Sequence, residues 1–273
     1  TWTALGKIDV CVLLCVSICF SLMGVVHDYF HIKNKNSDGL SFKQKIFFQS
    51  LVALLAMSYL YYSAEIIPET SFIVPFFKDL IVPMSPFIFI FTGIFVLVGS
   101  SNAVNLTDGL DGLAILPSVL IGGALGLIAY AMGNQLVSDY LYLPHLPLSG
   151  ELIVFCGALI GSGIGFLWYN TYPAQIFMGD IGSLALGAIL GIIAILLRHE
   201  LVFAIMAGVF VIETLSVAIQ IISYKTRGKR VFLMAPIHHH YELKGWAEPK
   251  IIVRFWIITL VLILIALATL KLR

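Results

Sequence analysis

The chain has 273 residues, of which 60% are hydrophobic and 11% charged, and its mean hydropathy is +1.00. A soluble surface needs far more charge than this, so the composition excludes a soluble protein and predicts an integral membrane protein. Sixteen basic and fifteen acidic residues nearly cancel, which leaves no overall field to attract nucleic acid. We therefore expect the lipid bilayer as a partner, no nucleic acid, and recognition of any anionic ligand by a local cluster.

Apolar stretches that can cross a bilayer recur along the chain. A transmembrane helix needs about 17–25 mostly apolar residues, and eight stretches approach or meet this length: 8–26, 46–62, 87–104, 112–132, 152–169, 183–197, 201–223 and 252–270. Nothing between them is long or polar enough to form a separate soluble domain. The sequence therefore predicts an all-α, polytopic bundle of eight transmembrane helices, with residues 1–273 forming one domain.

Basic residues are divided unevenly between the two sides of this bundle. The loops 27–45 and 224–254, which fall on one side, hold eleven of the sixteen Lys and Arg residues. Cytoplasmic loops of membrane proteins carry an excess of Lys and Arg, so we expect these two loops to face the cytoplasm. The segments 105–111 and 170–182 then face it too.

Four loops on that side carry almost all of the polar side chains that could take part in catalysis or bind a ligand. They read VVHDYFHIKNKNSDGL, NLTDGLDGL, NTYPAQIFMGDIGS and MAPIHHHYELKGW, and they start at residues 25, 105, 170 and 234. Helices of a bundle bring the loops of one face together, whatever their distance in the sequence. We expect these loops to form one polar cleft at the membrane surface.

Asp108 and Asp111 lie in the second of these loops, between two long apolar runs. A carboxylate in hydrocarbon costs about 2.5–3.5 kcal/mol on insertion scales, so water, a cation or a ligand must compensate each one. The two are three residues apart, and if the next helix begins here they project from the same side of its first turn. Capping of that helix would explain one aspartate, whereas a ligand-binding role would explain both, and we favour that role.

Asp180 is expected at the N-terminus of the sixth span, with Gly179 and Gly182 around it. A carboxylate there can hold Mg²⁺ against a phosphate, and the free N–H groups of the helix N-terminus bind the same anion. Capping of the helix is the structural alternative. Hard oxygen ligands without thiolates favour Mg²⁺ or Mn²⁺ over zinc.

His238, His239 and His240 are consecutive, so their side chains point in different directions and a three-histidine zinc site is not expected. The basic residues around them suit a polyphosphate, although attraction of the loop to anionic lipid would also account for the lysines. Carboxylates for a divalent ion, helix N-termini and a basic, His-rich loop in a membrane setting together predict phosphoryl transfer from a cytosolic, nucleotide-linked donor to a lipid acceptor.

Glu213 is the one acid deep inside a predicted span, in the segment VFVIETLSVAIQ. Acids within a membrane are by default candidates for a functional role. Thr214, Ser216 or Gln220 nearby would instead satisfy Glu213 structurally. The sequence leaves both interpretations open.

Three segments resemble the signature motifs of a known family: NAVNLTDGLDGLA, NTYPAQIFMGDIGSLALG and MAPIHHHYELKGW. They look like those of the phospho-N-acetylmuramoyl-pentapeptide-transferases, within the polyprenyl-phosphate N-acetylhexosamine-1-phosphate transferase superfamily, and the HHHYE segment separates these enzymes from relatives that transfer N-acetylhexosamine 1-phosphate. The resemblance runs from residue 8 to the C-terminus.

The resemblance implies an Mg²⁺-dependent enzyme of peptidoglycan synthesis in the bacterial cytoplasmic membrane, with its active site on the cytoplasmic side. Undecaprenyl phosphate would attack the sugar-side phosphorus of UDP-N-acetylmuramoyl-pentapeptide, which gives the lipid-linked sugar and UMP. The resemblance also leaves room for a homodimer.

Roles for individual residues follow from the same resemblance by motif position. Asp180 would be the Mg²⁺ ligand, Phe177 would stack on uracil, and Asn105 would line the nucleotide and pyrophosphate site. The substrate-binding set implied in this way is Asn105, Gly109, Leu110, Asn170, Phe177, His238, His239 and His240. The catalytic set is Asp28, Asp108, Asp111, Asp180 and His239.

The chain departs from the family pattern in two places. The family has ten spans, and its first two spans and a Gly-, Thr- and Pro-rich loop have no counterpart in these residues. A later loop of the family usually carries two adjacent aspartates and a lysine three residues after the second, where this chain has His27, Asp28 and His31. Two other functions remain open: transfer of GlcNAc 1-phosphate from UDP-GlcNAc, and binding of lipid phosphates without chemistry.

Overall fold

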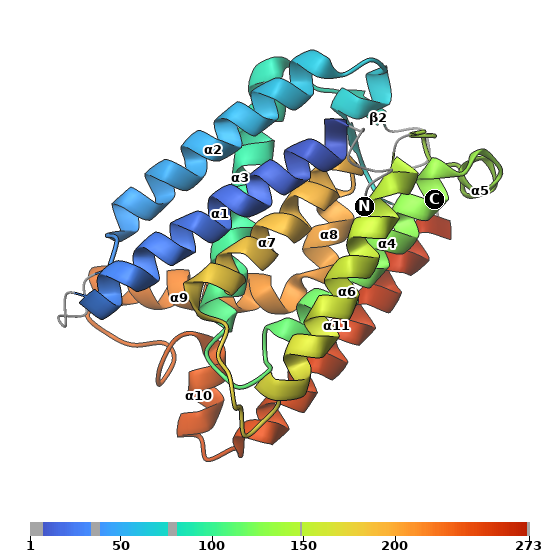
Figure 1. The fold of residues 1–273 in the computed structure, drawn as a ribbon. Coiled ribbons are helices and arrows are strands. Elements are labelled where there is room, and N and C mark those ends of the chain that lie inside the picture. The colour runs from blue at the N-terminus through green and yellow to red at the C-terminus, as the bar shows by residue number, and fades with distance from the viewer. Residues whose placement is uncertain (1–7, 34–38, 76–80, 148, 272–273) are drawn as a thin grey trace.

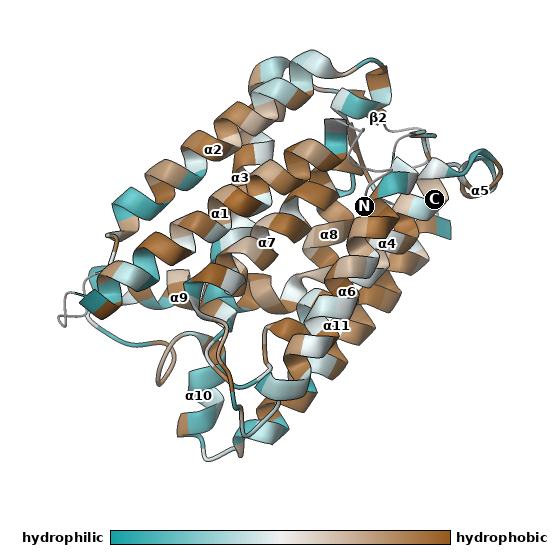
Figure 2. Cartoon of the chain, in the orientation of Figure 1, coloured by the Kyte–Doolittle hydropathy of each residue, from teal (hydrophilic) through white to brown (hydrophobic). Residues whose placement is uncertain are grey.

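The computed structural model describes residues 8–33, 39–75, 81–147 and 149–271. Within these ranges it contains eleven α-helices and one small antiparallel hairpin (Figure 1). Eight of the described helices are long and apolar enough to cross a membrane, and Figure 2 shows that their middle turns are predominantly hydrophobic. The prediction of an all-α, multi-pass membrane protein is confirmed.

The long helices alternate in direction and agree in order with the eight predicted spans. They are α1 (Ile8–Lys33), α2 (Phe42–Ser63), α3 (Pro86–Thr107), α4 (Ile115–Gly133), α6 (Leu152–Asn170), α7 (Gly179–Leu196), α9 (Gly208–Arg227) and α11 (Glu248–Lys271).

The short elements join these helices. They are η2 (Ile67–Thr70), β1 (Ser71–Ile73), β2 (Ile81–Pro83), α5 (Gln135–Leu141), η3 (Ser149–Glu151), α8 (Glu200–Met206) and α10 (Ile237–Leu243). β1 pairs with β2 in register, Phe72 opposite Val82. η2 and the β1–β2 hairpin lie between α2 and α3 in the chain, at the end of the bundle opposite to α10 (Figure 1).

Two spans differ most from the predicted bounds. α1 continues to Lys33, well past the predicted end at residue 26, because the stretch from Val25 to Lys33 contains no Gly or Pro to stop it. His27, Asp28 and His31 therefore lie on a helix and not in a loop. The predicted span 201–223 is interrupted at Ala207, where α8 ends and Gly208 begins α9.

α7 lies at the centre of the bundle, packed against α1, α3 and α4 (Figure 1). Small residues allow this close approach, as is typical of helices packed in membranes. A Cβ on Gly187 would lie 2.4 Å from the main-chain oxygen of Ser100 on α3, and a Cβ on Gly24 would lie 2.5 Å from the main-chain oxygen of Asp180. These two contacts bring the C-terminal ends of α1 and α3 to the N-terminal end of α7.

A second hydrophobic cluster anchors the loop between α3 and α4. Leu110 and Leu113 of that loop are buried together with three residues of α11 and one of α9, which are Ile251, Ile252, Phe255 and Val209. Burial of large apolar side chains contributes about 1.5–3 kcal/mol each. These two leucines therefore hold the loop, and they fix the positions of Asp111 between them and of Asp108 just before them.

Candidate active site

A cavity of about 340 Å³ opens between the last turn of α3 and the first turn of α7. Its lining comes from α3, the last residue of α6, the start of α7 and the loops that precede α4 and α7. The residues are Asn105, Asp108, Gly109, Leu110, Asp111, Asn170, Phe177, Met178, Gly179, Asp180 and Ser183. The structure thus brings together, around one cavity, all of the residues predicted for the second and third loops.

Asp180 is in the first turn of α7, as predicted, and both of its carboxylate oxygens have partners. Oδ2 lies 2.5 Å from the Nζ of Lys45, and Oδ1 accepts a hydrogen bond of 2.8 Å from the side chain of Asn105. The Asn105 amide also donates to the hydroxyl of Ser183 at 2.8 Å. No side-chain cap is formed at the start of α7, so the capping alternative for Asp180 is wrong.

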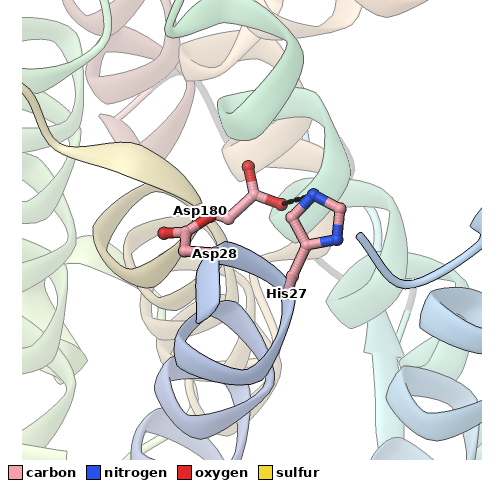
Figure 3. Close-up of side chains that lie close together, drawn as sticks. All are labelled: His27, Asp28 and Asp180. Carbon is pink, nitrogen blue, oxygen red and sulfur yellow. Dashed lines mark ion pairs between the residues drawn. The ribbon is translucent and has the colours of Figure 1, made fainter. Parts of the chain in front are cut away.

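The end of α1 adds His27 and Asp28 to this carboxylate (Figure 3). Nε2 of His27 lies 3.5 Å from Oδ2 of Asp180, and Asp28 lies against Gly179, where a Cβ would come within 2.9 Å of its Oδ2. One potential ligand atom from each of His27, Asp28 and Asp180 lies within 4.8 Å of the others. Asp28 and Asp180, which were predicted from separate loops, are therefore neighbours.

Asp108 and Asp111 are not on the first turn of a helix. α3 ends at Thr107 with Asp108 as its C-cap residue, and α4 begins at Ile115 without a side-chain cap. The two glycines and the two buried leucines keep the intervening chain in turns. The expectation that the aspartates share the first turn of α4 is wrong, and so is the alternative that one of them caps it.

The two aspartates have different surroundings. Oδ2 of Asp111 accepts a hydrogen bond of 2.8 Å from the main-chain N–H of Ala174, so this side chain ties the loop before α4 to the loop before α7. Burial, and then repulsion from Asp180, raise the pKa of Asp108 from 3.8 to about 6. Asp108 is therefore the carboxyl of the cavity whose protonation changes close to neutral pH.

Asn170 is buried beside the cavity, whereas Phe177 is exposed at its edge. Asn170 is buried, and it accepts from the N–H of Gly112 at 3.0 Å and donates to the carbonyl of Ile176 at 2.8 Å, so it joins the same two loops as Asp111. Phe177 is 77% exposed at the edge of the cavity. An exposed aromatic ring at this edge is available for stacking on a base.

The three histidines lie on α10 and do not line the cavity. His238 is fully buried, with Nδ1 3.1 Å from Oε1 of Glu213, whose other oxygen accepts a hydrogen bond of 2.8 Å from the N–H of Ile237. Nε2 of His238 faces Gly109, where a Cβ would lie only 2.4 Å away. Glu213 therefore holds the start of α10 against the loop that lines the cavity.

The remaining histidines point elsewhere, as expected for consecutive residues. Nδ1 of His239 lies 2.5 Å from a carboxylate oxygen of Glu242, and Nδ1 of His240 accepts a hydrogen bond of 3.1 Å from the N–H of Leu233. The structural alternative for Glu213 named the wrong partners. The hydroxyls of Thr214 and Ser216 donate to main-chain oxygens, and the Gln220 side chain bonds to main-chain groups of Val231 and Phe232.

Lys45 is a residue of the site that the sequence does not single out. It lies in the first turn of α2 and contacts Asp180, 135 positions further along the chain. In the sequence it is one of several basic residues counted for the orientation of the bundle, and nothing local distinguishes it from Lys43. Only the packing of α2 against α3 and α1, which brings its first turn to the start of α7, identifies its partner.

A family model described as glycosyl transferase family 4 matches residues 10–198, which is more than half of the chain. The chain belongs to glycosyl transferase family 4. It is accordingly a membrane transferase of the kind that moves a sugar phosphate to a polyprenyl phosphate, in a family that typically depends on a divalent metal.

The match to glycosyl transferase family 4 includes every residue of the cavity and also Asp28. It ends at Arg198, before α9, α10 and α11. The family assignment therefore covers the part of the chain with the carboxylates, whereas the histidine helix α10 lies outside the matched range.

Proposed function

We propose that the chain transfers phospho-N-acetylmuramoyl-pentapeptide from UDP-N-acetylmuramoyl-pentapeptide to undecaprenyl phosphate. An oxygen of the lipid phosphate attacks the sugar-side phosphorus, the bond from that phosphorus to the bridging oxygen breaks, and UMP leaves. The products are the lipid-diphosphate-linked sugar, which is the first lipid intermediate of peptidoglycan, and UMP. This proposal combines the family with the resemblance of the three loops.

The observation that carries the proposal is the cavity at the ends of α3 and α7. Carboxylates and an amide line its interior, an exposed aromatic ring lies at its edge, and the N-terminus of α7 offers main-chain N–H groups. A helix N-terminus favours a phosphate, and a volume of about 340 Å³ is within the range of ligand sites. Because both helices span the bilayer, a soluble donor and a lipid phosphate can both reach this position.

The donor atoms present fit Mg²⁺. Asp28 and Asp180 would hold the ion, since their oxygens approach each other closely and hard oxygen ligands are those that Mg²⁺ prefers. When bound, the ion supplies positive charge that neutralises the diphosphate of the donor and the phosphate that leaves. The chain itself adds Lys45 beside Asp180 as a fixed positive charge.

The other residues of the cavity bind and orient the substrates in this proposal. Phe177 stacks on the uracil ring, and Asn105 holds the Asp180 carboxylate in its observed orientation. The Asp108 carboxyl, with its pKa of about 6, can accept a proton from the lipid phosphate, whose second pKa is also about 6. His238 of α10 supports the loop from behind, through its contact with Gly109.

A second candidate is the transfer of GlcNAc 1-phosphate from UDP-GlcNAc to a polyprenyl phosphate. It is favoured by the range of the family match, which supports the common chemistry and stops before α10. The difference between the two functions is therefore expected in the C-terminal third of the chain, where the HHHYE segment lies.

The test is UMP release by the purified protein with undecaprenyl phosphate and Mg²⁺, measured with each UDP-sugar in turn. We expect release from UDP-N-acetylmuramoyl-pentapeptide and none above background after chelation of the metal. Release from UDP-GlcNAc alone would assign the second candidate, and excess unlabelled donor of the other kind would then fail to compete. No release from either donor would contradict both transferase functions, and it would favour the binding of lipid phosphates without chemistry.

The same proposal sets the orientation of the protein. A UDP-linked donor is a cytosolic compound. The protein therefore spans the inner membrane of the bacterial cell with its cavity on the cytoplasmic side. The excess of Lys and Arg in the loops at this end supports the orientation.

A further inference from the structure

The imidazole of His27 is held between two parts of the chain that are distant in sequence. Its Nδ1 accepts a hydrogen bond of 3.0 Å from the main-chain N–H of Leu40. Its Nε2 lies 3.5 Å from Oδ2 of Asp180, and Figure 3 shows the ring turned toward that carboxylate. The side chain is 18% exposed, so water competes little for either nitrogen.

Local structure keeps the Leu40 N–H on the ring. A Cβ on Gly39 would come within 2.5 Å of Cε1 and Nδ1 of His27, so glycine allows the main chain to close over the imidazole. Ser41 and Gln44 then form a capping box at the start of α2, which gives hydrogen-bond partners to the main-chain N–H groups of both residues. The donor is therefore part of an ordered helix start.

This hydrogen bond decides which nitrogen of a neutral His27 carries the proton. A main-chain N–H can only donate, so Nδ1 must provide its lone pair to Leu40. A neutral imidazole has one protonated and one unprotonated nitrogen, and the proton is therefore on Nε2, the atom that faces Asp180. Histidines that bind metals have the opposite arrangement, because the ligating nitrogen needs its lone pair and the other nitrogen donates.

We propose that His27 is a positioning residue, which donates from Nε2 to Asp180, and that it is not a ligand of the divalent ion. The ion then has an oxygen-only donor set from the chain, with Asp28 and Asp180. His27 and Lys45 hold Oδ2 of Asp180, and Asn105 holds Oδ1. A carboxylate has about four acceptor positions, so one remains on Asp180 for the ion.

The inference rests on the proposed function for the presence of the ion, but the tautomer can be measured without it. The first experiment is solid-state NMR of metal-free protein in lipid bilayers, with ¹⁵N-labelled histidine and an alkaline buffer that keeps imidazole neutral. The His27→Gln variant identifies the His27 signals among the seven histidines. We expect a protonated Nε2 and an unprotonated Nδ1 for His27, and the reverse would overturn the proposal.

A matched pair of variants tests the source of the tautomer. Leu40→Pro removes the main-chain N–H, and Leu40→Ala keeps it while also shortening the side chain. We expect the alanine variant to give the wild-type ¹⁵N signals of His27, and the proline variant to shift the Nδ1 signal toward that of a ring without this hydrogen bond. An Nδ1 signal that is the same in both variants would show that Leu40 does not set the tautomer.

The second experiment observes the metal directly. Mn²⁺ replaces Mg²⁺ in oxygen-ligand sites, and pulsed EPR detects a ¹⁴N nucleus bound to it. We expect wild-type protein loaded with Mn²⁺ to show no directly coordinated nitrogen. The ¹⁴N region of its pulsed EPR spectrum should be the same as that of His27→Gln. A strong imidazole ¹⁴N signal that His27→Gln removes would overturn the proposal. Absence of UMP release would contradict the proposed function, and it would leave the tautomer measured by NMR unaffected.

Discussion

At the scale of single residues, Asp180 is the point at which four segments of the chain meet. It contacts Lys45 of α2, Asn105 of α3 and His27 of α1 from its own place at the start of α7. Phe177 and Asp108 lie on the other sides of the same cavity. Three predictions concern these residues one at a time.

Asp180→Asn is expected to abolish UMP release and to leave the fold intact. The amide has nearly the same shape but coordinates Mg²⁺ weakly, and a metal ion supplies several kcal/mol of transition-state stabilisation, so the rate should fall about 100-fold or more. Asp139→Asn, the same change on an exposed residue of α5, is the control and should retain the wild-type rate. Wild-type turnover by Asp180→Asn would remove this residue from the chemistry.

Phe177→Ala is expected to weaken binding of the donor or of UMP by about 1–3 kcal/mol, the amount typical of a stacked base. The ring is 77% exposed, so its removal should not change thermal stability. Phe177→Trp keeps an aromatic face and should retain most of the affinity, as measured by isothermal titration calorimetry in detergent. Equal affinities of the alanine variant and the wild type would exclude stacking at this position.

Asp108→Asn is expected to stabilise the fold, increasingly as the pH rises. The folded-state pKa of about 6 is above the ordinary 3.8, so ionisation of the carboxylate lowers the stability of the folded protein. This cost is absent below the ordinary pKa, where both states are protonated, and it is complete above the folded pKa. Above pH about 7 the variant should be more stable by about 3 kcal/mol, the free energy that corresponds to this difference in pKa.

The measurement for Asp108→Asn is thermal unfolding of metal-free protein in detergent over a pH series. The difference in Tm between the variant and the wild type should widen between pH about 4 and 7 and then stay constant. A difference that is the same at every pH would show that the Asp108 carboxyl does not titrate in this range.

At the scale of helices, the site depends on how closely α1 approaches α7. Gly24 lies one turn before Asp28, and a Cβ there would meet the main chain of Asp180 and Ile181 at 2.5 Å. Main-chain atoms cannot move aside as a flexible side chain can, so α1 itself would have to move.

Gly24→Ala is therefore expected to reduce UMP release without unfolding the protein. A displacement of about 1 Å can cost about 100-fold in rate, and here it would separate Asp28 and His27 from Asp180. Gly165→Ala on α6, where a Cβ meets nothing within 4 Å, is the matched control and should be as active as the wild type. Full activity of Gly24→Ala would mean that the close contact of α1 with α7 does not position the site.

At the scale of the whole molecule, the proposed orientation can be tested with introduced cysteines. Lys229 follows α9 at the end with the cavity, and Gln135 begins α5 at the opposite end, and both are exposed. The four native cysteines lie within the spans α1 and α6, where a charged, membrane-impermeant maleimide does not reach them. We expect the maleimide to label Lys229→Cys in inside-out vesicles only, and Gln135→Cys in intact spheroplasts only. The reverse pattern would place the cavity outside the cell.

The fold class and the number of spans were predictable because the signal for a transmembrane helix is local. Each span is a run of apolar residues, and eight such runs predict the eight long helices in order. The end of α1 was not predictable from hydropathy, because His27 to Lys33 are polar enough to suggest a loop and yet contain no residue that stops a helix. The interruption at Ala207 was also missed, since α8 and α9 are both apolar.

The sequence by itself determined that the chain is a membrane protein and that Asp108, Asp180 and Phe177 lie at the same end of the helix bundle. Composition, hydropathy and alternating direction are sufficient for these conclusions, and they need no contact between distant residues. Tertiary structure alone decided that Lys45 and His27 hold Asp180, that Asp111 joins two loops, and that His238 is buried behind the cavity. The physical reason is that these contacts depend on how closely helices pack where glycines such as Gly24 face a neighbouring backbone, and no local pattern of residues specifies which helix that neighbour is.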